Sequence, residues 1–247
     1  MKTKNYIVFG LFAVLLGFMA VTEVTAGELL PPQQVIQDVS TQLQAKLKDK
    51  SFTQNFAQVT EYVNGVIDPH SDFDKISVLV LGKLWKTATT QDQERFKREF
   101  QTLLVRTYSR AFVEFNNWSI RFLPIEMESG ATKILVKTEV TQPNQQPVEV
   151  SYRMLLVDGK WKVYDIMING VSLVTNYRST FSEQIKTKGS LSAVIDDLAK
   201  RNVEALAPKK SATNLRRDKN IVKPFVVSVS NHERLDHTPF DKLRANG

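Results

Sequence analysis

The residues able to do acid–base chemistry in this sequence lie in two short segments. One segment reads Asp68-Pro69-His70-Ser71-Asp72. Pro and Asp are equally the residues of turns and helix N-caps, which is the interpretation we favour. The other holds Asp165, between Tyr164 and Ile166 in an apolar extended run. Asp165 could act as a general base in an enclosed pocket, or be a buried structural carboxylate that accepts hydrogen bonds, and we expect the structural role.

The sequence lacks the residues of several common catalytic and metal centres. It has no cysteine, which excludes disulfides, iron–sulfur clusters and a thiolate nucleophile. Three histidines offer little for a metal site. The glycine-rich nucleotide loops, the G-x-S-x-G elbow and the H-E-x-x-H motif do not occur. We therefore predict no catalytic residue, no metal and no cofactor, and a protein that is not an enzyme.

The net charge of +7 suggests an acidic partner, but the excess lies at the two ends of the chain. Residues 27–207 hold 22 Lys and Arg against 21 Asp and Glu, so this central part is nearly neutral. That balance argues against nucleic acid as a partner. Residues 208–247 hold nine Lys and Arg against four Asp and Glu, and residues 231–247 show no usable periodicity, so we expect a basic, disordered extension.

The N-terminus has the three parts of a secretory signal peptide. Lys2 and Lys4 precede an uncharged apolar run from Tyr6 to Val21, and Val24-Thr25-Ala26 places small residues before a cleavage site. The run is shorter than the roughly 20 apolar residues of a membrane span. We predict cleavage near Ala26 and, since the chain has no cysteine, export to a bacterial periplasm.

The apolar spacing divides residues 27–207, the predicted domain, into helices followed by strands. Helical spacing begins after Pro31-Pro32, and the clearest helix covers about residues 91–115. From Trp118 the period changes to two, and Asp158-Gly159 is a hairpin signal.

We predict four consecutive antiparallel strands from this alternation: 118–122, 134–141, 148–156 and 160–168. The fold class is α+β, with helices packed on one face of a highly twisted antiparallel sheet of about four strands. Such a layout encloses an apolar pocket, as in NTF2-like or cystatin-like folds.

Two blocks of the sequence carry a family resemblance. One runs from Val80-Leu81-Gly82-Lys83-Leu84-Trp85 into the helix that holds Thr107-Tyr108. The other is Gly159-Lys160-Trp161-Lys162-Val163-Tyr164-Asp165-Ile166 followed by Asn169-Gly170-Val171-Ser172-Leu173. Over about residues 30–203 the chain resembles the MlaC-type periplasmic phospholipid-binding proteins, the toluene-tolerance family.

The resemblance implies a soluble phospholipid carrier whose cargo is a bound phospholipid. The implied partners are an MCE-domain protein of an inner-membrane ABC transporter and an outer-membrane lipoprotein–porin complex, with maintenance of outer-membrane lipid asymmetry as the purpose. We expect a monomer. The family's lipid-contacting Tyr and Val map onto Tyr108 and Val171.

Further lipid-binding candidates come from apolar periodicity, although the sequence leaves open which sheet face points inward. They are Leu79, Phe100, Leu104, Val136, Val150, Tyr152, Ile166 and Ile168. Two other functions stay open at this point: a small-pocket enzyme that uses Asp165 as general base, and an envelope chaperone.

The first testable prediction concerns the N-terminus. Protein isolated from the periplasm should begin at Gly27, because the small residues before it fit a signal-peptidase site. N-terminal sequencing checks this, and membrane-bound protein that retains Met1 would contradict it.

Overall fold

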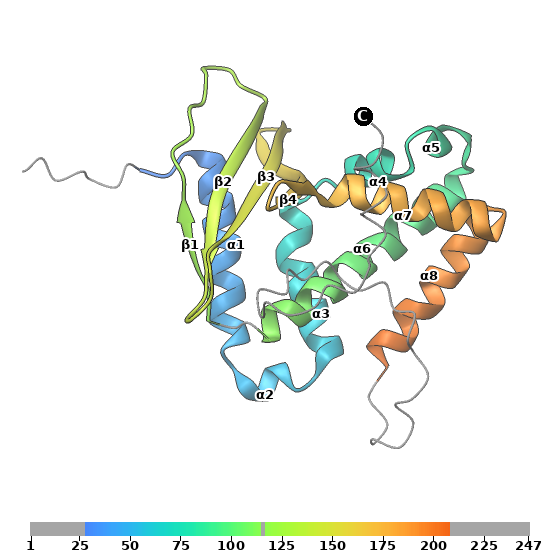
Figure 1. The fold of residues 1–247 in the computed structure, drawn as a ribbon, viewed down its shortest axis with the longest axis horizontal. Coiled ribbons are helices and arrows are strands. Elements are labelled where there is room, and N and C mark those ends of the chain that lie inside the picture. The colour runs from blue at the N-terminus through green and yellow to red at the C-terminus, as the bar shows by residue number, and fades with distance from the viewer. Residues whose placement is uncertain (1–27, 115–116, 208–247) are drawn as a thin grey trace, which may run out of the picture.

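The computed structural model describes residues 28–114 and 117–207, and within them a curved sheet stands on one side of a layer of helices (Figure 1). The predicted signal peptide and the predicted extension from residue 208 lie outside the described residues. The helices are α1 (Pro31–Leu47), α2 (Lys50–Thr53), α3 (Phe56–Ile67), the 3-10 helix η1 (Asp68–His70), α4 (Phe73–Leu81), α5 (Lys83–Thr87), α6 (Thr90–Glu114), α7 (Leu173–Lys188) and α8 (Leu191–Leu206). None of these helices combines the length and apolarity that a bilayer crossing needs.

The sheet is an antiparallel meander in chain order, which confirms the predicted fold class. Its strands are β1 (Ser119–Phe122), β2 (Lys133–Thr141), β3 (Val148–Val157), β4 (Lys160–Ile168) and β5 (Val171–Ser172). Asp158 and Gly159 both have positive φ, 48° and 74°, as a two-residue hairpin turn with the twist of the strands requires.

The sheet has a fifth strand that the sequence did not suggest. Asn169 and Gly170 also have positive φ, 46° and 80°, so they form a second tight turn. Chain reversal at this turn pairs Val171 with Ile168, and Ser172 with Met167. The two residues of β5 are too few to show a period, which is why Asn169-Gly170 looked like the end of the sheet.

Three clusters of buried apolar side chains hold the layers together. The largest joins α4, α6, α7 and α8 around the rings of Phe96, Phe100 and Phe181. The ring centroids of Phe96 and Phe181 lie 5.1 Å apart, and those of Phe100 and Phe181 lie 5.4 Å apart. A second cluster joins α1, α3 and α6, and a third packs α1 on the sheet. Because α6 belongs to two clusters and α1 to two, these helices tie the sheet to the helical layer.

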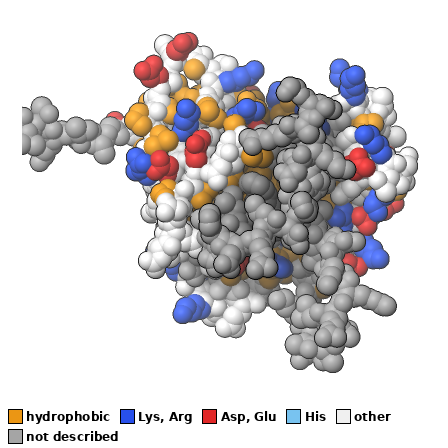
Figure 2. Space-filling view, in the orientation of Figure 1, with side chains coloured by type: hydrophobic (Ala, Val, Ile, Leu, Met, Phe, Trp, Pro, Cys, Tyr) orange, Lys and Arg blue, Asp and Glu red, His pale blue; other side chains and the backbone are white. Residues whose placement is uncertain are grey.

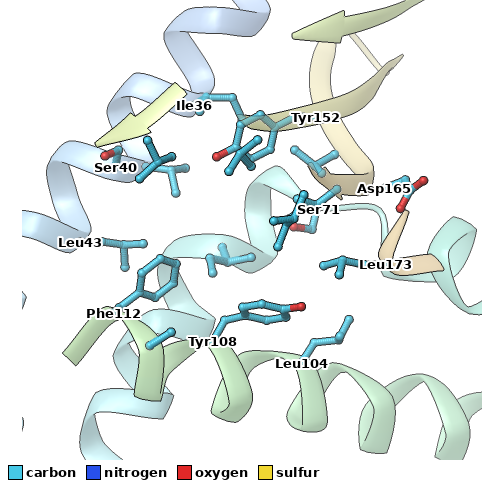
Figure 3. A pocket seen from close by; sticks show the side chains of 18 of the residues that line it. Ile36, Ser40, Leu43, Ser71, Leu104, Tyr108, Phe112, Tyr152, Asp165 and Leu173 are labelled. Carbon is cyan, nitrogen blue, oxygen red and sulfur yellow. The ribbon is translucent and has the colours of Figure 1, made fainter. Parts of the chain in front are cut away.

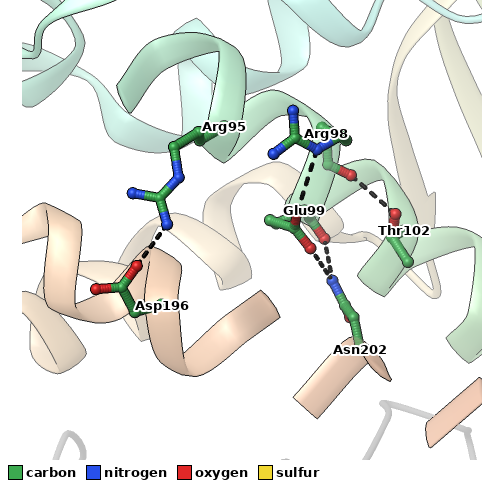
Figure 4. Close-up of polar contacts among 6 residues, drawn as sticks. All are labelled: Arg95, Arg98, Glu99, Thr102, Asp196 and Asn202. Atoms are coloured by element: carbon green, nitrogen blue, oxygen red, sulfur yellow. Dashed lines mark hydrogen bonds and ion pairs between the residues drawn. The ribbon is translucent and has the colours of Figure 1, made fainter. Parts of the chain in front are cut away.

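Hydrogen bonds and an ion pair hold α8 against α6 (Figure 4). Asn202 is buried, and its amide nitrogen donates to the carbonyl oxygen of Glu99 at 2.9 Å and to the Glu99 carboxylate at 3.0 Å. Its amide oxygen accepts from Nε of Arg106 at 2.8 Å. Nearer the start of α8, Arg95 pairs with Asp196. A buried amide with these partners sets the position of α8 along α6.

Asp165 joins the sheet to the start of α7. One carboxylate oxygen accepts from the backbone N–H of Val174 at 3.1 Å, and the other from the hydroxyl of Ser172 at 2.7 Å. Arg153 donates to that second oxygen at 3.3 Å. The first N–H groups of a helix have no partner within the helix, and an anion beside them is stabilised by the helix dipole. Asp165 is therefore used structurally, as an anchor for α7.

We predict that Asp165→Asn lowers the free energy of unfolding by about 1–2 kcal/mol, because the neutral amide loses the charge-assisted hydrogen bonds at the helix start. Thermal or urea denaturation followed by circular dichroism measures the change.

Asp158→Asn is the matched control. Asp158 is exposed in the β3–β4 turn at φ 48°, where asparagine is well tolerated, so the melting temperature should stay unchanged. Equal stability of Asp165→Asn and the wild type would show that the anchor is dispensable.

Candidate functional site

A cavity of about 370 Å³ lies between the inner face of the sheet and helices α1, α6 and α7 (Figure 3). Small-molecule sites in proteins span roughly 300–1,000 Å³, so this volume suits a ligand. Most of the lining side chains are aliphatic or aromatic. Exposed Gln145 and Gln146, in the β2–β3 connection, stand at its edge, so the cavity meets solvent there.

The strand register shows which sheet face points into the cavity. Val150 lies opposite Ile168, and Tyr152 lies opposite Ile166, so these four side chains share one face. All four line the cavity. The sheet wall therefore brings together four of the five strand residues that periodicity suggested.

A bulge in β4 explains why the face was hard to read from the sequence. Arg153 pairs with Asp165, but the next residue, Met154, pairs with Val163, so Tyr164 is the extra residue. A bulge shifts the alternation by one position. Odd-numbered Val163 and even-numbered Ile166 consequently both line the cavity.

Helix α6 forms the opposite wall with a stripe of residues spaced by four. Phe100, Leu104 and Tyr108 all line the cavity, and Figure 3 shows Leu104 and Tyr108 projecting from α6 into it. Phe100 is 1% exposed because it also belongs to the helical cluster. The stripe predicted for this helix is thus part core and part cavity wall.

Three of the predicted residues do not line the cavity. Leu79 packs against the helical cluster, since the wide apolar surface of α4 faces other helices. Val136 is on the inner sheet face, opposite Tyr152, but it is fully buried in the cluster that packs α1 on the sheet. Val171 is 45% exposed and lies opposite Ile168, which places it at the sheet edge beside the cavity.

Sequence reasoning missed the contributions of α1 and α7. Ser40 and Leu43 of α1 and Tyr177 of α7 line the cavity. The apolar stripe of α1 was visible as a helix signal, but nothing in the sequence showed that it faces the sheet. Tyr177 is 8% exposed, and its neighbours along the chain are polar, so α7 gave only a weak pattern.

The lining carries almost no charge. Among the lining residues that the structure describes, Asp165 and His70 are the ionisable side chains apart from the tyrosines, and none is a Lys, Arg or Glu. The oxygens of Asp165 are held by Ser172, Val174 and Arg153. Within the described ranges no group of three or more potential ligands is arranged for a metal ion.

Three tyrosines of the cavity, Tyr108, Tyr152 and Tyr177, stay neutral at physiological pH. Burial raises the pKa of Tyr152 to about 12, although a hydrogen bond with Thr138 offsets part of that effect. Burial also raises the pKa of Tyr108 and that of Tyr177. A phenol is uncharged below its pKa, so these rings present neutral surface to a ligand.

Comparison with known proteins gives consistent matches. The family described as MlaC protein matches residues 37–200. The toluene tolerance protein Ttg2D of Pseudomonas putida is 28% identical over 187 residues, covering 74% of this chain and 85% of the relative. The intermembrane phospholipid transport system binding protein MlaC of Haemophilus influenzae is 24% identical over 177 residues. This match covers 70% of this chain and 80% of the relative.

A solved structure agrees with these relatives. A phospholipid-binding protein from Ralstonia solanacearum, in complex with a phospholipid, is similar with a TM-score of 0.66 and 26% sequence identity. The match covers 72% of this chain and all of that one. Since the family match spans well over half of the sequence, the chain belongs to the MlaC family.

Proposed function

We propose that this protein binds a phospholipid, with acyl chains in the cavity, and carries it through the periplasm. The single observation behind the proposal is the cavity itself, which is large, apolar and almost uncharged. The name of the Haemophilus influenzae relative and the phospholipid in the Ralstonia solanacearum structure support the same ligand.

The energetics of a lipid in water explain why a carrier needs such a lining. A two-chain lipid has some 30 methylenes, and at roughly 0.8 kcal/mol each their exposure costs about 24 kcal/mol. A cavity lined by Val150, Ile166 and Leu104 removes methylenes from water without a catalytic group. A charged lining would forfeit this gain, because each charge would have to lose its hydration.

The wider transport system is part of the proposal. We place the mature protein between an inner-membrane ABC transporter with its MCE-domain partner and an outer-membrane lipoprotein–porin complex, where it would help maintain lipid asymmetry. The surface agrees with short-lived docking: Figure 2 shows Lys and Arg interspersed with Asp and Glu on the described part of one face, with hydrophobic side chains between them. Val171 at the sheet edge and Tyr108 in the cavity are proposed lipid contacts.

Denaturing extraction and mass spectrometry of protein purified from the periplasm test this function. Phospholipid at a near-stoichiometric level is the expected result. Protein without lipid that turns over a small molecule, with turnover abolished in Asp165→Asn, would favour the enzyme instead.

We predict that Val150→Glu lowers the co-purified phospholipid at least about tenfold, because a carboxylate in the wall must lose hydration at a cost of several kcal/mol or draw water in. Val150 belongs to none of the three buried clusters, so the melting temperature of the variant should match that of wild-type protein stripped of its lipid. Extracted phosphorus per mole of protein is the measurement.

Leu156→Glu is the control on the same strand. Leu156 is 37% exposed and does not line the cavity, so its lipid content should equal that of the wild type. Normal lipid content in Val150→Glu would place the acyl chains elsewhere.

A further inference from the structure

Two tyrosine side chains from different helices line the cavity. Tyr108 of α6 and Tyr177 of α7 both line the cavity. Figure 3 shows the hydroxyl of Tyr108 on the side of Leu173, and Tyr177 lies one turn further along the same face of α7. Within the described residues no hydrogen bond joins either hydroxyl to another group, whereas the hydroxyl of Tyr62 donates to the carbonyl oxygen of Gln42 at 3.1 Å.

The two tyrosine side chains are shielded from solvent to different degrees: Tyr177 is 8% exposed, and Tyr108 is half-buried. Burial is the main cause that raises the pKa of Tyr108. The electrostatic effect of the neighbouring Tyr177 is the second cause, and it acts in the same direction. The ring of Tyr177 is held by Phe100, with centroids 5.1 Å apart and planes at 72°. Aromatic packing of this kind fixes the direction of the hydroxyl.

Packing alone does not require tyrosine at these positions. Phe100 and Phe112 line the cavity from the same helix as Tyr108, and Phe181 follows Tyr177 one turn later on α7. A phenylalanine would fill the same space. Neither tyrosine hydroxyl is among the enclosed, unpartnered atoms of the described residues, so both open into accessible space, where water can solvate them. A bound acyl chain would displace that water, and a hydrogen-bond acceptor on the ligand would offset the loss.

We propose that Tyr108 and Tyr177 form a polar subsite that donates hydrogen bonds to the ester carbonyl oxygens of a bound diacyl lipid. This inference rests on the proposed function and adds a ligand class to it. The protein should therefore bind lipids with ester-linked chains in preference to lipids with ether-linked chains.

The surroundings favour a carbonyl over a phosphate as the acceptor. A phosphate carries charge, and among the described residues that line the cavity there is no Lys or Arg to pair with it. Arg106, which acts electrostatically on Tyr177, lies outside the lining, and its Nε donates to Asn202. Neutral hydroxyls in an apolar wall match a neutral carbonyl, the polar group that joins each acyl chain to the glycerol.

A competition experiment measures the preference directly. The full mature protein is incubated with excess vesicles that hold equal amounts of a diester phosphatidylethanolamine and its diether analogue with the same chains, and the bound lipids are quantified by mass spectrometry. We expect the wild type to enrich the diester. Tyr108→Phe and Tyr177→Phe should each reduce the enrichment about fivefold, the value of one hydrogen bond.

Tyr62→Phe is the matched control, because its hydroxyl bonds outside the cavity, and it should keep the wild-type ratio. Melting temperatures of lipid-free Tyr108→Phe and Tyr177→Phe should not fall, since neither change breaks a protein hydrogen bond. Equal binding of the two lipids by the wild type, or enrichment unchanged in both variants, would overturn the subsite while leaving the carrier function intact. Absence of either lipid from the protein would overturn the carrier function and the subsite together.

Discussion

The structure depends on keeping an apolar space open between a sheet and a helical layer. Protein interiors are close-packed, and unfilled volume costs stability because its walls lose dispersion contacts. At about 24 cal/mol per Å³, a dry cavity of about 370 Å³ would cost ~9 kcal/mol. That is comparable with the entire stability of a domain, roughly 5–15 kcal/mol. A fold that keeps such a space needs walls supported from behind and a ligand that fills it.

The three buried clusters supply that support. The cluster around Phe96 and Phe181 packs α6 and α7 against α4 and α8, and the cluster under α1 holds the sheet. Asp165 connects the two walls, because it belongs to β4 and its carboxylate accepts from the start of α7. Asp165, which the sequence offered as a possible general base, therefore helps to keep the cavity in shape.

Sequence patterns predicted the helices, the meander and the α6 stripe, since each repeats over many residues. Asp158-Gly159 predicted its turn because positive φ requires such residues. Features set by tertiary contact escaped prediction: the bulge at Tyr164, the burial of Val136 in the cluster that packs α1 on the sheet, and the inward position of Tyr177. Apolar character at Leu79 and Val136 indicates burial, but burial in a core and exposure to a cavity have the same sequence signal.

The central claim is that a bound lipid fills the apolar cavity and thereby stabilises the fold. The most direct measurement is the melting temperature of the mature protein before and after removal of its lipid. A ligand that binds the folded state alone stabilises it in proportion to its affinity and concentration. The account predicts a fall of at least several degrees in melting temperature on lipid removal, and recovery when diacyl phospholipid is returned. An unchanged melting temperature in protein shown to be lipid-free would contradict it.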